Sequence, residues 1–283
     1  MADADRWLLN NLSTFELGLL IVGGGVVLAV GGFLLVRLFV PPETRIENNE
    51  VAGVLLGLLG AFYGIVLGFA IVVLFEDFRA ADQSVKDETT ALAQLYRTTD
   101  LFPPHARANV GKAIAQYRDA VRTLEWPLMR DGEESLRAHN LFGTIYTQIE
   151  NVKPKPHTDV QNVFYGETVS ALNELVAARR TRLNAATEAL PSPFQVLLLG
   201  GGFVLILFLY FFGMNNKRAH LLMVAGVSGV MAFSLLLVLL LAFPFSGHVT
   251  VSSEPFKLGI IGQLSPVTGL ARPGPCDNCF GPP

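Results

Sequence analysis

Long hydrophobic stretches and the polar segments between them define the pattern of this chain. Four stretches contain no Asp, Glu, Lys, Arg or His, and they cover residues 17–36, 51–75, 194–212 and 221–243. Each is long enough to cross the hydrocarbon core of a bilayer as a helix, which takes about 20 apolar residues. We therefore predict four transmembrane helices in an integral membrane protein.

The lengths of the polar segments predict how these helices connect. Short connections join the spans in two pairs, whereas a long segment separates the pairs. We divide the chain into an N-terminal tail with two spans (1–75), a soluble domain (76–192), two further spans (193–245) and a C-terminal tail (246–283). With four spans, both tails and the soluble domain lie on one side of the membrane.

The side on which the soluble domain lies is left open. The short connections carry Arg37, Arg45, Lys217 and Arg218. Their density favours a periplasmic domain by the positive-inside rule, but long segments follow that rule poorly.

The soluble segment has the apolar periodicity of helices. The second span continues without Pro or Gly to Thr99, so we expect one helix of about 50 residues. Further helices are predicted from Pro104 to before Pro127, over 133–152 and over 157–190, with proline residues at the breaks. The predicted fold is an all-α membrane protein with a helical bundle inserted between its second and third spans.

The C-terminal tail changes character after residue 245. Residues 249–251 (Val-Thr-Val) predict a short strand, and the Gly/Pro-rich end is expected to be flexible. Cys276 and Cys279 form a lone C-x-x-C pair, which is compatible with a disulfide, a metal site shared between subunits, or incidental thiols. No other metal site is expected.

Composition and motifs narrow the function. Hydrophobic residues make up 51% of the chain and charged residues 16%, which excludes an ordinary soluble protein. Basic residues in the soluble domain are scattered, so nucleic acid is not an expected partner. There is no P-loop, G-x-S-x-G or H-E-x-x-H motif, so we expect neither catalysis nor a cofactor.

Glycines recur on one side of the second span. At about 100° per residue they fall within about 80° of one face, which allows close approach of another helix. The set is Gly53, Gly57, Gly60, Gly64 and Gly68. This face predicts either helix packing, within or between subunits, or the wall of a narrow pore.

Aromatic and acidic residues give the same helix further candidate roles. Rings that project into a symmetric assembly form a hydrophobic constriction, and acidic rings at pore mouths favour cations. The constriction candidates are Phe62, Tyr63 and Phe69, and the acidic candidates are Glu47, Glu50, Glu76 and Asp77. The alternatives are contacts with lipid or another helix for the rings, and ordinary interfacial charges for the acids.

Several short motifs resemble the bestrophin-like domain family of bacterial membrane proteins. They are Glu47-Asn48-Asn49-Glu50 before Gly53, Tyr63 with Leu67-Gly68-Phe69, Asp87-Glu88, Leu95-Tyr96, Pro244-Phe245-Ser246-Gly247 and Glu254-Pro255-Phe256. The resemblance covers residues 15–260. Bestrophins are pentameric anion channels with four spans, a helical cytosolic domain after the second span, and an apolar neck on that helix.

This resemblance implies a pore helix at 51–75 that continues into the soluble domain. The chain departs from bestrophins in its heavier glycine stripe and in lacking an acidic calcium clasp near its C-terminus. Calcium gating and anion selectivity are therefore not carried over.

Our leading hypothesis is a homo-oligomeric ion channel of the bacterial inner membrane, with lipid, inorganic ions and further copies of itself as partners. The alternative is a non-conducting, membrane-anchored structural or sensory protein whose helical domain binds a partner. A proton-driven motor subunit is disfavoured because the spans contain no acidic residue.

Overall fold

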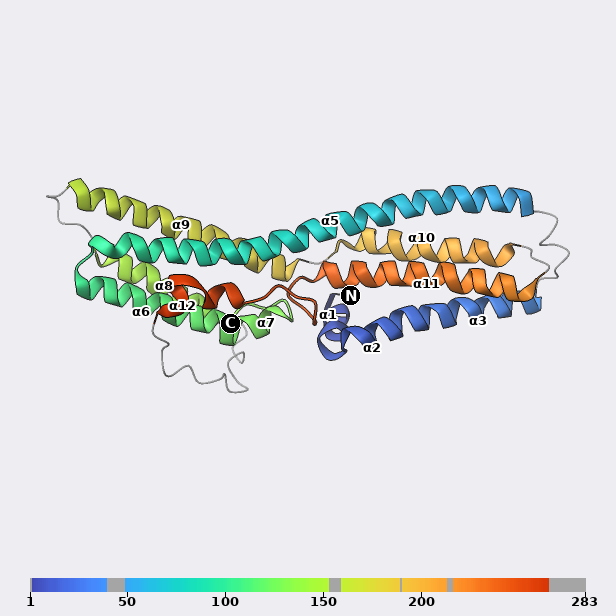
Figure 1. Ribbon diagram of the computed structural model, residues 1–283, viewed down its shortest axis with the longest axis horizontal. Helices are drawn as coiled ribbons and strands as arrows, with labels where there is room; N and C mark the ends of the chain where they lie inside the picture. The colour runs from blue at the N-terminus through green and yellow to red at the C-terminus, as the bar shows by residue number, and fades with distance from the viewer. Residues whose placement is uncertain (1, 40–48, 153–158, 189, 213–215, 265–283) are drawn as a thin grey trace, which may run out of the picture. The chain divides into compact units, whose positions relative to one another are not determined.

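The computed structural model describes residues 2–39, 49–152, 159–188, 190–212 and 216–264, and these residues include no strand. Contacts group them into two units (Figure 1). The first comprises Met1–Phe78 with Ala189–Val249, and the second comprises Arg79–Glu188 with the described residues from Thr250 onward. The C-terminal segment therefore belongs to the second unit by its contacts.

The first unit holds the apolar helices. In chain order its elements are α1 (Ala2–Asn11), α2 (Thr14–Gly18), the π-turn η1 (Leu19–Gly23), α3 (Gly24–Phe39), the first part of α5 (Asn49–Thr98), α10 (Ser192–Phe211) and α11 (Lys217–Ala242). Four helices are long and apolar enough to cross a membrane. The predicted all-α fold with four spans is thus confirmed.

Packing in the first unit leaves each span partly uncovered. Side chains of α5, α10 and α11 share one buried cluster that includes Leu67, Leu205 and Val238. Helix α11 also packs along α3, where Phe33 and Val224 are buried. Few residues of the four apolar stretches are buried within the subunit, so lipid or further protein must cover the rest.

The N-terminal helix is held by the turn after the last span. The side-chain oxygen of Asn10 accepts a hydrogen bond from the Gly247 amide at 2.9 Å. Gly247 has φ of 81°, and a Cβ there would lie 3.2 Å from the Leu9 carbonyl oxygen, so the turn requires glycine. Ser13 and Glu16 then form a capping box that starts α2.

The second unit is a helical bundle. It contains the rest of α5, η2 (Thr99–Leu101), α6 (Pro104–Ala120), the π-turn η3 (Val121–Glu125), α7 (Trp126–Met129), α8 (Leu136–Glu150), α9 (Asp159–Thr187), η4 (Glu254–Lys257) and α12 (Gly259–Gln263). Residues Val85, Leu92 and Leu95 of α5 are fully buried. As predicted, α5 is a single helix, and it is 50 residues long.

Two predictions in these segments are wrong. The helix from Pro104 does not end before Pro127, because the wider π-turn η3 leads directly into α7. Pro127 lies in the first turn of α7, where the N–H that proline lacks would have no partner within the helix. Residues 249–251 form no strand: a strand needs a partner edge for its backbone groups, and the described residues provide none. Val251 is buried as a side chain of an irregular segment.

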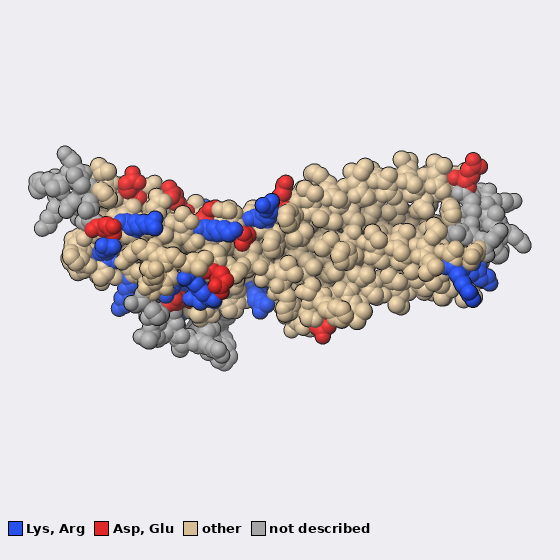
Figure 2. Space-filling view, viewed as in Figure 1, with Lys and Arg blue, Asp and Glu red and all other residues tan. Residues whose placement is uncertain are grey.

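The distribution of charge follows the two units. Figure 2 shows Lys, Arg, Asp and Glu mixed over the visible face of the second unit, whereas the apolar helices are uncharged between their ends. This surface suits a hydrocarbon environment around the first unit and water around the second.

Candidate functional site

Helix α5 has one covered and one uncovered face within the first unit. The covered stripe consists of Tyr63, Leu67, Ala70 and Leu74, which are at most 8% exposed and follow the i, i+3, i+4 spacing of one helix face. The opposite face carries large exposed side chains, namely Val54, Leu58, Phe62, Ile65, Phe69 and Val72. The single chain thus leaves a continuous apolar strip of α5 largely exposed.

Two of the three aromatic candidates lie on this uncovered side. Phe62 is 63% exposed and Phe69 is 67% exposed. They are seven residues apart, so on an ideal helix they point within about 20° of each other. Both rings are free to meet lipid, another subunit or a pore.

Tyr63 points the other way, into its own subunit. Its hydroxyl donates a hydrogen bond to the Leu198 carbonyl of α10 at 2.8 Å. Its ring fills the space beside Gly201 and Gly202, where an added Cβ would lie 2.7 Å and 3.1 Å from Tyr63 atoms. A ring enclosed in this contact does not face the uncovered side of α5, so Tyr63 is not a constriction candidate.

The glycine stripe is open for most of its length. A Cβ added to Gly57, Gly60, Gly64 or Gly68 would meet no atom within 4 Å, whereas one at Gly53 would lie 3.4 Å from the Phe212 ring. Packing within the subunit therefore does not explain these four glycines. The two remaining explanations are packing between subunits and a pore wall.

The acidic candidates lie at both ends of the apolar part of α5. Glu50 is exposed in the first helical turn, and Glu76 and Asp77 are exposed beyond the apolar stretch. Glu47, Cys276 and Cys279 lie outside the described residues. Within the described ranges, no group of three or more His, Cys, Asp and Glu residues is placed to hold a metal ion.

The second unit contains a buried charge cluster that the sequence analysis did not predict. It consists of Glu88 of α5, Glu125 of η3, and Arg179 and Arg182 of α9, each at most 4% exposed. Arg182 Nε lies 2.6 Å from Glu88, and its Nη2 lies 2.7 Å from Glu125. Arg179 binds both oxygens of Glu125, at 2.6 Å and 2.8 Å. Two acids and two guanidiniums balance, so the charge cluster is neutral.

Tyr117 of α6 is hydrogen-bonded to two members of the charge cluster. Its hydroxyl donates to Glu88 and accepts from Arg179 Nη1 at 2.9 Å. Burial raises the pKa of Tyr117 well above its ordinary value, and the Glu88 carboxylate adds to this effect. Burial alone would raise the pKa of Glu125, but the charge of Arg182 and the bonds from Arg179 outweigh it and hold this pKa below its ordinary value. Glu125 therefore stays ionised near neutral pH.

The sequence does contain a signal for the charge cluster. Glu88 is in helical phase with the apolar residues Val85, Leu92 and Leu95, so an acid stands on the buried stripe of α5. An acid in that position requires buried cationic partners, which pattern analysis alone does not identify.

The C-terminal segment packs against the helices of the second unit. Phe256 is fully buried, and its ring lies 6.1 Å from that of Trp126 in an edge-on contact. Arg118 Nη1 donates to the carbonyls of Ile261 and Leu264, at 2.5 Å and 3.1 Å, and so caps the end of α12.

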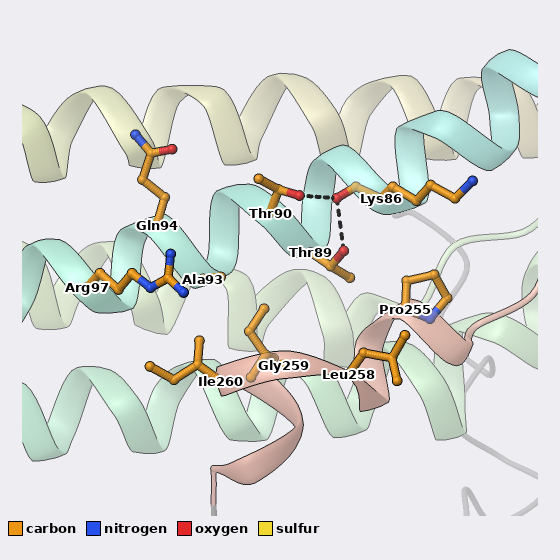
Figure 3. A pocket seen from close by; sticks show the side chains of 11 residues that line it. Lys86, Thr89, Thr90, Ala93, Gln94, Arg97, Pro255, Leu258, Gly259 and Ile260 are labelled. Carbon is orange, nitrogen blue, oxygen red and sulfur yellow. Dashed lines mark hydrogen bonds between the residues drawn. The ribbon is translucent and has the colours of Figure 1, made fainter.

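An open cleft of about 600 Å³ lies between α5 and this C-terminal segment (Figure 3). Lys86, Thr89, Thr90 and Arg97 line the α5 side, and Leu258 and Ile260 are among the residues on the other side. Both threonine hydroxyls donate to the Lys86 carbonyl, as the dashed lines show. The hydroxyl protons are thus used within the helix, and the cleft offers no convergent set of buried polar groups.

Similar solved structures support the fold. A crystal structure of a bacterial bestrophin homologue from Klebsiella pneumoniae, a single-substitution variant, has a TM-score of 0.62 at 14% identity and covers 82% of this chain and 93% of its own. A second variant of that homologue gives 0.59 at 14% identity, covering 82% and 95%. A structure described only as a membrane protein with one proline-to-alanine substitution gives 0.61 at 14% identity, covering 81% and 93%.

The family is shown by the sequence itself. No curated protein matches the chain. The family model described as the bestrophin-like domain, however, matches residues 23–256, which is most of the sequence and includes α5, the charge cluster and Phe256. This protein is therefore a member of the bestrophin-like family.

Proposed function

We propose that this protein is a homo-oligomeric ion channel of a bacterial inner membrane in which α5 lines the pore. The observation that carries the proposal is the uncovered face of α5, where an apolar strip and four open glycines occur on a helix whose opposite face is fully packed. The fold of bacterial bestrophin homologues supports the same assignment.

The glycines favour protein over lipid as a neighbour of α5. Small residues in membrane helices are enriched where two backbones approach closely, and a lipid-facing surface gains nothing from omitting side chains. Gly57, Gly60, Gly64 and Gly68 have no neighbour in their own subunit. A second copy supplies one without any other partner.

The exposed rings of Phe62 and Phe69 lie on a different side of α5 from the glycines, about 150° around an ideal helix from the centre of the glycine stripe. Copies of α5 arranged with the ring side inward would direct Phe62 and Phe69 towards a common axis. Rings there form an apolar constriction, which controls ion flow by excluding water rather than by binding ions. No charged residue is needed inside the spans for this mechanism.

The acidic residues indicate which ions the proposed pore should prefer. Glu50 at one end of the apolar stretch, and Glu76 with Asp77 at the other, would form acidic rings around the two mouths. Such rings concentrate cations and repel anions. We therefore propose a cation preference, in contrast to the anion selectivity of bestrophins.

The direct test is to reconstitute the purified protein in planar bilayers and record single-channel currents in asymmetric potassium chloride. Discrete current steps are expected, with a reversal potential on the cation side. A silent bilayer with the oligomer intact would instead favour the non-conducting structural or sensory role.

A pair of glycine variants tests the role of the uncovered face. Gly64→Leu places a large side chain where the subunit itself has room, so the subunit should fold while assembly or current is lost. Gly200→Leu is the matched control, because Gly200 of α10 is also open in the subunit but lies outside the proposed interface. Equal assembly and current in both variants would contradict the assignment.

A further inference from the structure

Two large aromatic rings are exposed just before the first apolar stretch. Trp7 of α1 is 62% exposed, and Phe15 of α2 is 80% exposed. Both belong to the first unit. The proposed pore, which uses α5, gives neither ring a role, so the neighbours of these rings must be sought outside the chain.

Two contacts with the end of α11 fix where α1 lies along the spans. The guanidinium carbon of Arg6 lies 5.3 Å from the centre of the Phe243 ring, and Asn10 accepts its hydrogen bond from the Gly247 amide at 2.9 Å. Phe243 is the last residue of the fourth apolar stretch. Helix α1 therefore lies where the spans end, and Figure 1 shows it there beside the end of α11. The hydrocarbon core gives way to lipid headgroups at this level.

The two rings point away from the protein. Leu9 is 2% exposed and shares a buried cluster with Leu17 and Phe243. Trp7 comes two residues before Leu9, which on an ideal helix places it about 160° away, on the opposite side of α1. Phe15 and Leu19 are four residues apart and both exposed, so Phe15 begins the uncovered side of the first span.

The chemistry of this surface matches the boundary between lipid headgroups and acyl chains. Tryptophan is enriched at that boundary, because its ring is apolar while its N–H needs a polar partner. Asp3 of α1 and Glu16 of α2 are exposed beside the rings. Carboxylates are strongly unfavourable in hydrocarbon, so they prevent the segment from moving deeper into the bilayer.

We propose that α1 and α2 form an interfacial anchor for the first span, in which Trp7 and Phe15 insert between the headgroups of the bilayer that the spans cross. The exposed side of Phe15 continues directly into Leu19 and Leu20 of the span, which are 66% and 54% exposed. Lipid covers such a surface and leaves the neighbouring carboxylates in water, whereas a second copy of the chain would bury them. The anchor is the same whether or not the protein conducts ions.

The test measures which lipid atoms reach the Trp7 ring. The full-length protein is placed in phosphatidylcholine vesicles whose acyl chains carry bromine, a contact quencher of indole, either near the headgroup or near the chain end. The Trp7 emission is the difference between wild type and Trp7→Phe, because the chain has two tryptophans and Trp126 is unchanged. We expect a loss of Trp7 emission that is larger with bromine near the headgroup.

A second tryptophan position controls for depth. Phe203→Trp in the Trp7→Phe background places an indole near the middle of α10, where the native ring is 67% exposed. Its emission should be lost most with bromine near the chain end, the reverse of the Trp7 order. The same order at both positions would contradict an interfacial location for Trp7.

Quenching from the water distinguishes the remaining results. Trp7 emission that is lost with dissolved iodide but not with brominated lipid would place the ring in water, and emission that responds to neither would place it against another copy. Either result would overturn the proposal. If Trp7→Phe does not fold, the emission that Phe15→Trp adds to wild type replaces the Trp7 measurement, and it should show the same preference for bromine near the headgroup.

Discussion

The ring of Tyr63 occupies the space that a side chain at Gly201 would fill. An added Cβ there would lie 2.7 Å from the ring, while the Tyr63 hydroxyl reaches past it to the Leu198 carbonyl at 2.8 Å. The glycine on α10 and the tyrosine on α5 are therefore complementary, and each explains why the other residue is present. Phe62, the preceding residue, lies on the uncovered side of the same helix.

Gly201→Ala should destabilise the subunit by about 1–3 kcal/mol, the usual cost of forcing an extra methyl group into a packed contact. Gly200→Ala is the control, since a Cβ at Gly200 meets nothing within 4 Å. Unfolding of both variants in detergent, followed by circular dichroism, measures the difference. Equal stability of the two would show that the Tyr63 contact is loose.

Removing a ring from the uncovered face should open the pore. Phe62→Ala or Phe69→Ala is expected to raise basal conductance, because a wider constriction stays wet. Phe203→Ala on α10 removes a ring that is equally exposed, at 67%, from a helix outside the proposed pore. Single-channel recordings compare the three, and wild-type currents in both α5 variants with normal assembly would exclude these rings as the gate.

Neutralising the acidic mouth should change selectivity rather than gating. The combined change Glu76→Gln and Asp77→Asn is expected to shift the reversal potential in a salt gradient towards anions, since fewer cations are concentrated at the mouth. Asp87→Asn serves as the control for loss of an exposed acid elsewhere on α5. If the double variant keeps the wild-type reversal potential, these carboxylates are ordinary interfacial charges.

Arg118 should control how firmly the C-terminal segment is held. Arg118→Gln removes charged hydrogen bonds to two carbonyls, each worth about 1.5–3 kcal/mol, so amides of residues 254–264 should exchange with solvent at least about tenfold faster. Arg107→Gln on the same helix is the control, because its pair with Asp100 is exposed. Hydrogen exchange read by mass spectrometry makes the comparison, and equal protection would contradict the capping role.

The charge cluster predicts a loss of stability in acid. The pKa of Glu125 is lowered in the folded state, so its contribution is fully present above the ordinary glutamate pKa and is lost as the pH falls through the folded-state pKa. Glu125→Gln should be less stable at neutral pH and should lose less stability on acidification. Thermal unfolding between neutral pH and pH 3 tests this, and parallel pH profiles would contradict it.

The elements of this fold were largely predictable, because each depends on a local signal. An uninterrupted run of apolar residues predicts a span, and the absence of Pro and Gly after Phe75 predicts the continuation of α5. The error at Pro127 has a definite cause. A π-turn just before the proline provides the one place in a helix where its ring and missing N–H are tolerated.

The candidate site was less predictable, because it depends on which other helix packs against each face of α5. Phe62 and Tyr63 are adjacent aromatic residues in the sequence, yet one is exposed and the other packs against glycines contributed by α10, more than a hundred residues away. Glu88 is similar, since its partners come from α6 and α9. Local periodicity shows that an acid stands on an apolar stripe, but only the folded chain shows that Arg182 pairs with it.

The four predicted spans contain no Asp, Glu, Lys, Arg or His, and this has a consequence for how an applied potential acts on this protein. Moving one elementary charge through 100 mV is worth about 2.3 kcal/mol, and voltage sensors depend on several such charges within their helices. The buried charges of the second unit lie outside the predicted spans and sum to zero, so they add no sensor. In the proposed channel, the membrane voltage would therefore act on the ions in transit and would leave the conformational equilibrium of the protein almost unchanged.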